Sequence, residues 1–550
     1  MKIALAQVNY LIGDFEGNTH KIIESIKQAR IQHADLIVFA ELSVCGYPPR
    51  DFLEFDDFIL RCNEQIKVIA SECKDIAAIV GAPSVNPAPK GKPLFNSAYF
   101  LENGEVKAIV HKTLLPNYDI FDEYRYFEPN RTFNLIDFRG VKIALTICED
   151  LWNISDNPLY ILSPMDELAN LKPDLMINIA ASPFSYSQVA ERKEILVRNT
   201  LKYKIPLIYV NHVGGQTELL FDGGSMVVDS NGDVRHQCRL FEEDLSVVDM
   251  HQINTLPLLN SEAIPDKISL IHDALVMGIR DYFKKLNFSK AILGLSGGID
   301  SAVTLALAVE ALGKENVRPV LLPSRFSSDH SISDAQDIIK NIGCSYDLIS
   351  IDKAFTAFEE SLEPVFNDIP FGLAEENIQA RTRAVILMGM ANKLGYILLN
   401  TSNKSEAAVG YGTLYGDMCG GISVLGDVYK TDVFRLAYYI NRNKEIIPIN
   451  TIIKPPSAEL RPNQKDSDSL PDYELLDQIL FLYIEQRKGP GEIVKAGFDE
   501  AIVNRVLRMV NSNEWKRQQT PPILRVSYKA FGSGRRVPIV ARYLLYNFYV

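Results

Sequence analysis

Short apolar runs alternate with amphipathic stretches through the first half of the chain. The runs at 2–8 and 142–148 are rich in Ile, Leu and Ala, as expected for buried strands. Between such runs lie stretches like 18–33, whose apolar positions recur with helical spacing. Residues 97–112 contain two β-type runs around an Asn-Gly turn signal, which predicts an antiparallel hairpin. The pattern predicts a layered α/β domain with a mixed sheet over residues 1–250.

A second α/β pattern follows a stretch without clear periodicity. Residues 251–262 contain a proline and are interpreted as a linker. Beyond them we expect a helix over 267–286, a strand over 291–295 and, after a glycine-rich turn, a helix over 300–312. The second domain is therefore predicted to span 263–550.

The composition narrows the class of protein. A chain of 550 residues predicts at least two domains, and a net charge of -12 argues against a broad nucleic-acid-binding surface. No apolar run reaches the roughly 18 residues that a membrane span needs. The seven cysteines are odd in number and form no C-x-x-C pair, so neither a disulfide framework nor a zinc site is expected. With no signal peptide recognisable, the cytoplasm is the expected location.

Three reactive side chains each end an apolar run: Glu41, Lys112 and Cys148. Chemistry collects at the carboxyl ends of strands in α/β sheets. Cys148 can act as a nucleophile, Lys112 can favour its thiolate and stabilise an oxyanion, and Glu41 can move the proton. Each residue alone is more often a packing or solvated turn residue, and spacing does not bring the three together.

The segments around these residues, 39–51, 111–129 and 147–153, resemble the three catalytic segments of the nitrilase superfamily. The resemblance implies an αββα sandwich with a Glu41–Lys112–Cys148 triad and an additional acidic residue at Glu123. Within the superfamily, the glutaminase branch is the most similar. That branch implies glutamine-binding positions at Tyr118, Ser182 and Gln188, where Gln188 replaces an expected lysine.

The run 291–308 reads strand, loop and helix around Ser-Gly-Gly-Ile-Asp-Ser. Glycines let backbone N–H groups approach an anion at the helix N-terminus, and Asp300 could hold a metal ion that bridges phosphates. The Lys-Ser/Thr pair of a Walker A loop is absent. A plain glycine turn is the alternative interpretation.

This loop resembles the pyrophosphate loop of N-type ATP pyrophosphatases, and most of 265–550 resembles their NAD synthetase branch. The resemblance implies a doubly wound parallel sheet. It assigns ATP contacts to Leu293, Gly294, Leu295, Ser296, Gly297, Gly298, Ile299, Asp300, Ser301 and Thr401. It assigns deamido-NAD contacts to Asn377, Arg381, Glu406 and Lys516, and Mg²⁺ to Asp300 and Glu406. Asp417 and Lys430 are expected near the reacting phosphates.

The two resemblances complement each other, because they imply that one half releases ammonia from glutamine and that the other consumes ammonia. We expect Cys148 to form a thioester while ATP and Mg²⁺ adenylylate the nicotinate carboxylate of deamido-NAD. The resemblance also implies an enclosed passage for ammonia and a homo-oligomer. Two alternatives stay open: an amidase of another substrate fused to a different adenylating domain, and a metabolite-binding scaffold with a dead site.

Overall fold

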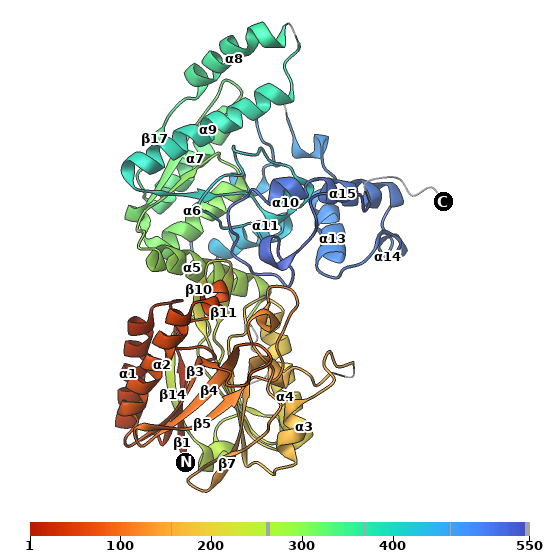
Figure 1. Ribbon diagram of the computed structural model, residues 1–550. Helices are drawn as coiled ribbons and strands as arrows, with labels where there is room; N and C mark the ends of the chain where they lie inside the picture. The colour runs from red at the N-terminus through yellow and green to blue at the C-terminus, as the bar shows by residue number, and fades with distance from the viewer. Residues whose placement is uncertain (156, 260–264, 368, 463, 545–550) are drawn as a thin grey trace. The chain divides into compact units, whose positions relative to one another are not determined.

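The computed structural model describes residues 1–155, 157–259, 265–367, 369–462 and 464–544 (Figure 1). The chain divides into two compact units, Met1–Pro265 and Asp266–Val550. The start of the expected linker is ordered. Met250–Thr255 forms the 3-10 helix η4, and its Ile253 is buried in the core of the first unit. Residues 260–262 of the expected linker lie outside the described residues.

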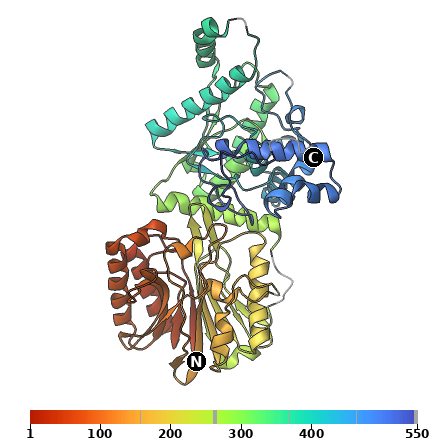
Figure 2. The same ribbon diagram turned by 45° about the vertical axis from the view of Figure 1, so that its right-hand side comes forward.

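The first unit has two six-stranded sheets that pack face to face between helices (Figures 1 and 2). Strand residues alternate between two cores: Ile3 and Leu5 face the other sheet, whereas Ala4 and Ala6 face helices α1 (Phe15–Ile31) and α2 (Asp56–Glu72). One sheet has the order β14 (Asp244–Asp249), β1 (Lys2–Gln7), β2 (Leu36–Val38), β3 (Ala77–Val85), β4 (Leu94–Glu102), β5 (Glu105–His111). The other has the order β13 (Val234–Gln237), β12 (Met226–Val228), β9 (Leu207–Asn211), β8 (Leu175–Ala180), β7 (Val141–Ile147), β6 (Ile136–Phe138). The helices are α1 (Phe15–Ile31), α2 (Asp56–Glu72), α3 (Pro164–Ala169) and α4 (Gln188–Tyr203).

The second unit is built on a five-stranded sheet whose paired strands are all parallel. The strand order is β17 (Asp347–Leu348), β16 (Val317–Leu321), β15 (Ala291–Gly294), β18 (Ile397–Asn400), β19 (Ile422–Ser423). From β15 the chain moves first toward one edge and then returns to the other side. The crevice beyond β15 and β18 is therefore the topological switch point, where ligands bind in open α/β sheets.

Helices cover both faces of this sheet, and further helices form a separate core (Figures 1 and 2). On one face α5 (Lys267–Lys285), α6 (Ile299–Leu312) and α11 (Lys430–Ile440) pack together. On the other, α9 (Leu373–Leu394) contacts β15 and β18, and α8 (Asp352–Phe366) contacts α9. The separate core joins α10 (Lys404–Val409), α13 (Tyr473–Ile484), α14 (Pro490–Lys495) and α15 (Glu500–Ser512). The predicted αββα sandwich and doubly wound parallel sheet are both confirmed.

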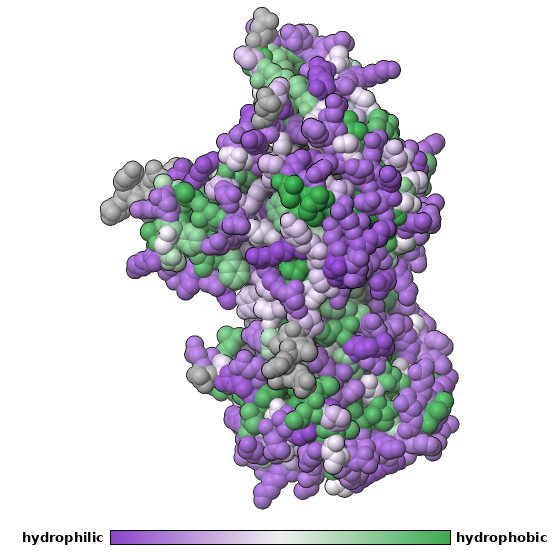
Figure 3. Space-filling view, turned by 180° about the vertical axis from the view of Figure 1, so that it is seen from behind, coloured by the Kyte–Doolittle hydropathy of each residue, from purple (hydrophilic) through white to green (hydrophobic). Residues whose placement is uncertain are grey.

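The surface in Figure 3 is mostly hydrophilic, with small groups of hydrophobic residues on each unit. Among the described residues, no helix has the length and apolar composition that crossing a membrane requires.

Candidate active sites

Side chains from different strands of the first unit meet at one buried point. Glu41 follows β2, Lys112 follows β5 and Cys148 follows β7. The Lys112 ammonium lies 2.6 Å from Oε1 of Glu41 and 2.8 Å from Oε1 of Glu123. All four residues are buried, and the charges of Glu41 and Lys112 act on the Cys148 thiol. The structure thus brings together the four residues that the nitrilase resemblance selected.

The carboxylates of this cluster are held in fixed orientations. Oε1 of Glu41 also accepts a hydrogen bond of 2.7 Å from the side-chain amide of Asn96. Its other oxygen accepts one of 2.9 Å from the backbone N–H of Ala181. Glu123 accepts a hydrogen bond of 2.9 Å from the Tyr47 hydroxyl. A carboxylate restrained at both oxygens can exchange a proton with a neighbour without reorienting.

A further carboxylate, that of Asp150, shapes the turn that carries Cys148. Cys148 has a φ of 45°, a left-handed conformation that is strained for a residue with a side chain. Two residues on, buried Asp150 accepts backbone N–H groups of Ile147, Thr113 and Leu114 at 2.8–3.0 Å. Asp150 therefore ties the Cys148 turn to the segment that follows Lys112.

Burial shifts the pKa values of the ionisable groups in this site. Burial and the charge of Glu41 raise the pKa of Cys148 well above its usual value, although Lys112 acts in the opposite direction. The charge of Lys112 thus favours the thiolate, whereas burial and Glu41 favour the thiol. Burial also raises the pKa of Glu123 to about 7. Burial opposes the charge of Lys112, but Glu123 and Glu41 raise its pKa well above the usual range.

One of the residues expected to bind glutamine, Tyr118, contacts a further acid, Glu149. The Tyr118 hydroxyl donates to both carboxylate oxygens of Glu149, at 2.9 and 3.1 Å, and Tyr160 donates to Oε1 at 3.1 Å. Buried Ser182 donates its backbone N–H to a side-chain oxygen, and Gln188 is the first residue of α4. Glu149 and Tyr160 were not predicted. The available signal for Glu149 is an acid directly after Cys148 at the end of a buried strand.

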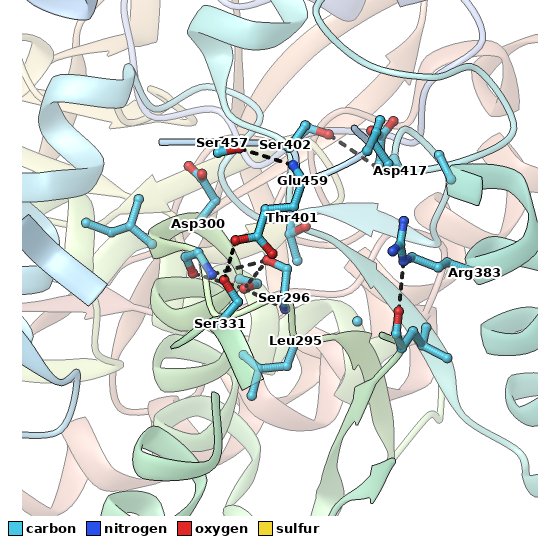
Figure 4. A pocket seen from close by; sticks show the side chains of 18 of the residues that line it. Leu295, Ser296, Asp300, Ser331, Arg383, Thr401, Ser402, Asp417, Ser457 and Glu459 are labelled. Carbon is cyan, nitrogen blue, oxygen red and sulfur yellow. Dashed lines mark hydrogen bonds between the residues drawn. The ribbon is translucent and has the colours of Figure 1, made fainter. Parts of the chain in front are cut away.

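In the second unit a cavity of about 320 Å³ opens at the switch point (Figure 4). Its lining includes these expected ATP-contacting residues: Gly294, Leu295, Ser296, Gly298, Ile299, Asp300, Ser301 and Thr401. Leu293 lies within buried β15, and Gly297 has a φ of 77°. A Cβ on Gly297 would lie 2.2 Å from the carbonyl oxygen of Ser331. Only glycine therefore fits this position.

One wall of the cavity carries two acids that share a lysine. The Lys430 ammonium lies 2.5 Å from Oδ2 of Asp300 and 3.1 Å from Oε1 of Glu406. Burial raises the pKa of Glu406 to about 8, against the effect of Lys430. In the part of the chain that the structure describes, no group of three or more His, Cys, Asp and Glu residues is arranged to hold a metal ion. Two carboxylates beside a glycine-rich loop nevertheless fit Mg²⁺, which is usually bound through one or two carboxylates together with substrate phosphates.

The expected deamido-NAD contacts other than Glu406 lie outside the cavity lining. Asn377 accepts the Thr413 hydroxyl at 2.7 Å, and Arg381 donates to the Leu414 carbonyl at 3.2 Å. Lys516 donates to the carbonyls of residues 410 and 412 at 3.0 and 3.1 Å. The three side chains thus converge on the turn 410–414, which leads to Asp417 at the cavity wall.

The loop that follows α12 (Ile449–Ile453) contributes to the cavity. Lys454 donates to the Gly297 carbonyl at 3.3 Å and to the Ser331 hydroxyl at 3.1 Å. The carboxylate of Glu459 accepts the Ser331 hydroxyl at 2.7 Å, and in Figure 4 it points toward that residue. The loop therefore packs on the pyrophosphate-type loop.

Comparison with known proteins agrees with both sites. Residues 2–255 match the carbon-nitrogen hydrolase family, and residues 271–520 match the NAD synthase family. The chain is 44% identical to a glutamine-dependent NAD(+) synthetase of Synechocystis sp., over 98% of each protein. It is 39% identical to one from Thermotoga maritima, over 99% of each. A solved structure of glutamine-dependent NAD+ synthetase from Acinetobacter baumannii, in complex with adenosine diphosphate, is 39% identical, with a TM-score of 0.78 and 98% coverage of each chain.

The fold and sites thus define a class, a carbon–nitrogen hydrolase unit joined to an NAD synthase unit. Similarity along the full length is more specific than either unit alone. The chain belongs to the glutamine-dependent NAD(+) synthetases. The predicted enzyme class is confirmed, and a fusion of another amidase with another adenylating domain is not favoured.

Proposed function

We propose that the chain makes NAD from deamido-NAD, ATP and ammonia, and that its first unit obtains the ammonia from glutamine. The observation that carries this proposal is the pairing of a buried Glu41–Lys112–Cys148 cluster with a pyrophosphate-type loop beside Lys430. An amide hydrolase releases ammonia, and ammonia is the nucleophile that attacks an adenylated carboxylate.

In the first unit, Glu41 takes the Cys148 proton as sulfur attacks the glutamine amide carbon. Burial and the charge of Glu41 favour the protonated thiol, so we propose that proton transfer accompanies attack. Lys112 stabilises the oxyanion of the tetrahedral intermediate. Glu41 then returns the proton to the departing ammonia and activates the water that hydrolyses the γ-glutamyl thioester. Glu149 and Tyr118 are proposed to orient glutamine, as are Ser182 and Gln188.

In the second unit, backbone N–H groups of the 296–301 loop hold the ATP phosphates with Lys430. Asp300 and Glu406 would hold Mg²⁺, which neutralises phosphate charge when bound. The nicotinate carboxylate attacks the α-phosphorus and pyrophosphate leaves, after which ammonia attacks the activated carbonyl and AMP leaves. Asn377, Arg381 and Lys516 are proposed to shape the deamido-NAD site through the turn 410–414.

The test supplies deamido-NAD, ATP and Mg²⁺ with either glutamine or an ammonium salt, and measures NAD and AMP. The expected result is equal amounts of NAD and AMP with either donor. Cys148→Ala should lose the glutamine-dependent reaction and keep the ammonium-dependent one. Xanthosine monophosphate and aspartate serve as control acceptors, and turnover of either without turnover of deamido-NAD contradicts the proposal.

We also propose that the protein is cytoplasmic and that it forms a homo-oligomer. Light scattering at working concentration tests the oligomeric state. A monomer would contradict the assembly without affecting the assigned reaction.

A further inference from the structure

Glu406, which lines the cavity of the second unit, lies on a short helix. It lies on α10, a helix of six residues, which is too short to be stable without tertiary contacts. At its start, the Asn403 side chain accepts the Glu406 backbone N–H at 3.0 Å and donates to Asp300 at 2.9 Å. The position of α10 therefore sets the position of Glu406, and the residue that caps α10 contacts the second acid, Asp300.

The N-terminal end of α10 is anchored from behind by a buried charge cluster. The fully buried Lys404 ammonium lies 2.9 Å from a carboxylate oxygen of Asp427 and 2.9 Å from one of Glu485. It also donates to the Ser527 hydroxyl at 2.7 Å and to the Lys529 carbonyl at 3.0 Å. One ammonium does not balance two buried carboxylates, so the polar groups of the C-terminal segment carry part of the compensation.

The negative charge of Asp427 is stabilised by hydrogen bonds from the C-terminal segment. One of its oxygens accepts the backbone N–H groups of Val526 at 2.8 Å and Ser527 at 2.7 Å. Its other oxygen accepts the Ser527 hydroxyl at 2.7 Å. Ser527 therefore links Lys404 with Asp427, and its hydroxyl is used both as a donor and as an acceptor.

The C-terminal end of α10 is held by the residues before this segment. Arg517 donates to the Ala408 carbonyl at 2.6 Å, and Asn513 donates to the Val409 carbonyl at 3.0 Å. Glu514 binds Arg517 and Arg535, each at 2.8 Å. Both ends of the helix are thus bound by residues close to the end of the chain.

We propose that residues 522–535 position α10, and with it Glu406, for adenylation, and that Ser527 and Lys404 are the positioning residues. This inference rests on the proposed function. The segment begins just after residue 520, the last residue matched to the NAD synthase family. It runs beside β19, because the Pro522 carbonyl accepts the Ser423 N–H at 2.8 Å and Leu524 donates to the Ser423 carbonyl at 3.2 Å.

The test uses Ser527→Ala in the full chain, with Ser527→Thr as the variant that keeps the hydroxyl. Replacing Lys404 is avoided, since it would leave two buried carboxylates unpaired. His272→Gln is the matched control, because it removes a buried polar group of the same unit that pairs with Asp273 and Glu310, away from α10. Three quantities are measured: hydrogen exchange of the amides of α10, ammonium-dependent NAD synthesis, and glutamine hydrolysis.

In Ser527→Ala, we expect hydrogen exchange of the α10 amides to become roughly tenfold faster. The kcat for ammonium-dependent synthesis should fall roughly tenfold, as it does when catalytic groups are slightly displaced. Ser527→Thr should recover most of the kcat, and glutamine hydrolysis should be unchanged. Wild-type exchange and kcat in Ser527→Ala would overturn the proposal. So would an exchange increase spread evenly over the unit, with a loss of kcat equal to that of His272→Gln. If the wild-type chain makes no NAD, the proposed function fails, while exchange in α10 still reports whether the segment holds the helix.

Discussion

Replacing Lys112 with methionine tests the charge balance of the first site. In the wild-type chain the buried ammonium is shared by Glu41 at 2.6 Å and Glu123 at 2.8 Å. Lys112→Met keeps most of the side-chain volume but leaves two carboxylates unpaired in the interior. Removing one partner from a buried ion pair typically costs about 3–5 kcal/mol of unfolding free energy.

The size of this loss should depend on pH, and its direction follows from Glu123. Burial already raises the Glu123 pKa to about 7 with Lys112 present, and losing the ammonium raises it further. A carboxyl group whose folded pKa exceeds its unfolded value destabilises the fold as pH rises toward and through the folded pKa. We therefore expect a smaller stability loss at pH 6 than at pH 8. Adding Glu123→Gln should restore much of the stability at pH 8.

The assay is urea unfolding of the first unit at both pH values, together with glutamine hydrolysis. Hydrolysis should fall by roughly 10²–10³-fold in Lys112→Met, with or without Glu123→Gln, because the oxyanion loses its cation. Cys148→Ala is the matched control, since it abolishes hydrolysis and leaves the three charges in place. Lys112→Met that is as stable as this control at pH 8, or that hydrolyses glutamine within tenfold of the wild-type rate, would refute the reasoning.

Three further predictions concern single contacts. Asp300→Ala should abolish AMP formation and leave glutamine hydrolysis at least partly intact, as nucleotide chromatography can establish; an unchanged AMP rate would exclude the metal-binding assignment. Glu149→Gln should raise the KM for glutamine roughly tenfold, more than Tyr118→Phe does, because hydrogen bonds to charged groups contribute about 1.5–3 kcal/mol. Burial opposes the charge of His272, but Asp273 and Glu310 raise its pKa to about 9. Because those carboxylates are half exposed, we expect about 1–2 kcal/mol of stability that is present below pH 6.5 and lost as pH rises through about 9. Chemical unfolding measures this loss, and an identical pH profile in His272→Gln would contradict it.

The strand ends could be predicted because each reactive residue follows an apolar run. Their meeting could not, since 71 residues separate Glu41 from Lys112 and only the sheet order brings them within 2.6 Å. Periodicity predicts which face of a strand is buried and says little about which strands are neighbours. The family resemblance therefore supplied the grouping that spacing lacked.

Contacts with backbone carbonyls, and contacts made by residues of loops, were the hardest to predict. Lys516 was assigned to deamido-NAD from its motif, but its ammonium lies against the carbonyls of residues 410 and 412. Glu459 belongs to a stretch rich in proline and polar residues, a composition typical of a surface loop, yet it contacts Ser331 at the cavity. Such contacts depend on where a loop returns to the core, which local composition does not determine.

Both sites use the same electrostatic device, a buried lysine shared by two acids: Lys112 with Glu41 and Glu123, and Lys430 with Asp300 and Glu406. Each group carries one more negative charge than positive when both acids are ionised, and burial makes that excess costly. In the proposed glutaminase reaction, a proton taken from Cys148 neutralises one carboxylate while the negative charge moves to the sulfur. In the proposed adenylation, the excess would favour a divalent cation arriving with ATP. The same arrangement therefore suits proton transfer where the neighbour is a thiol, and phosphate chemistry where the neighbour is a glycine-rich loop.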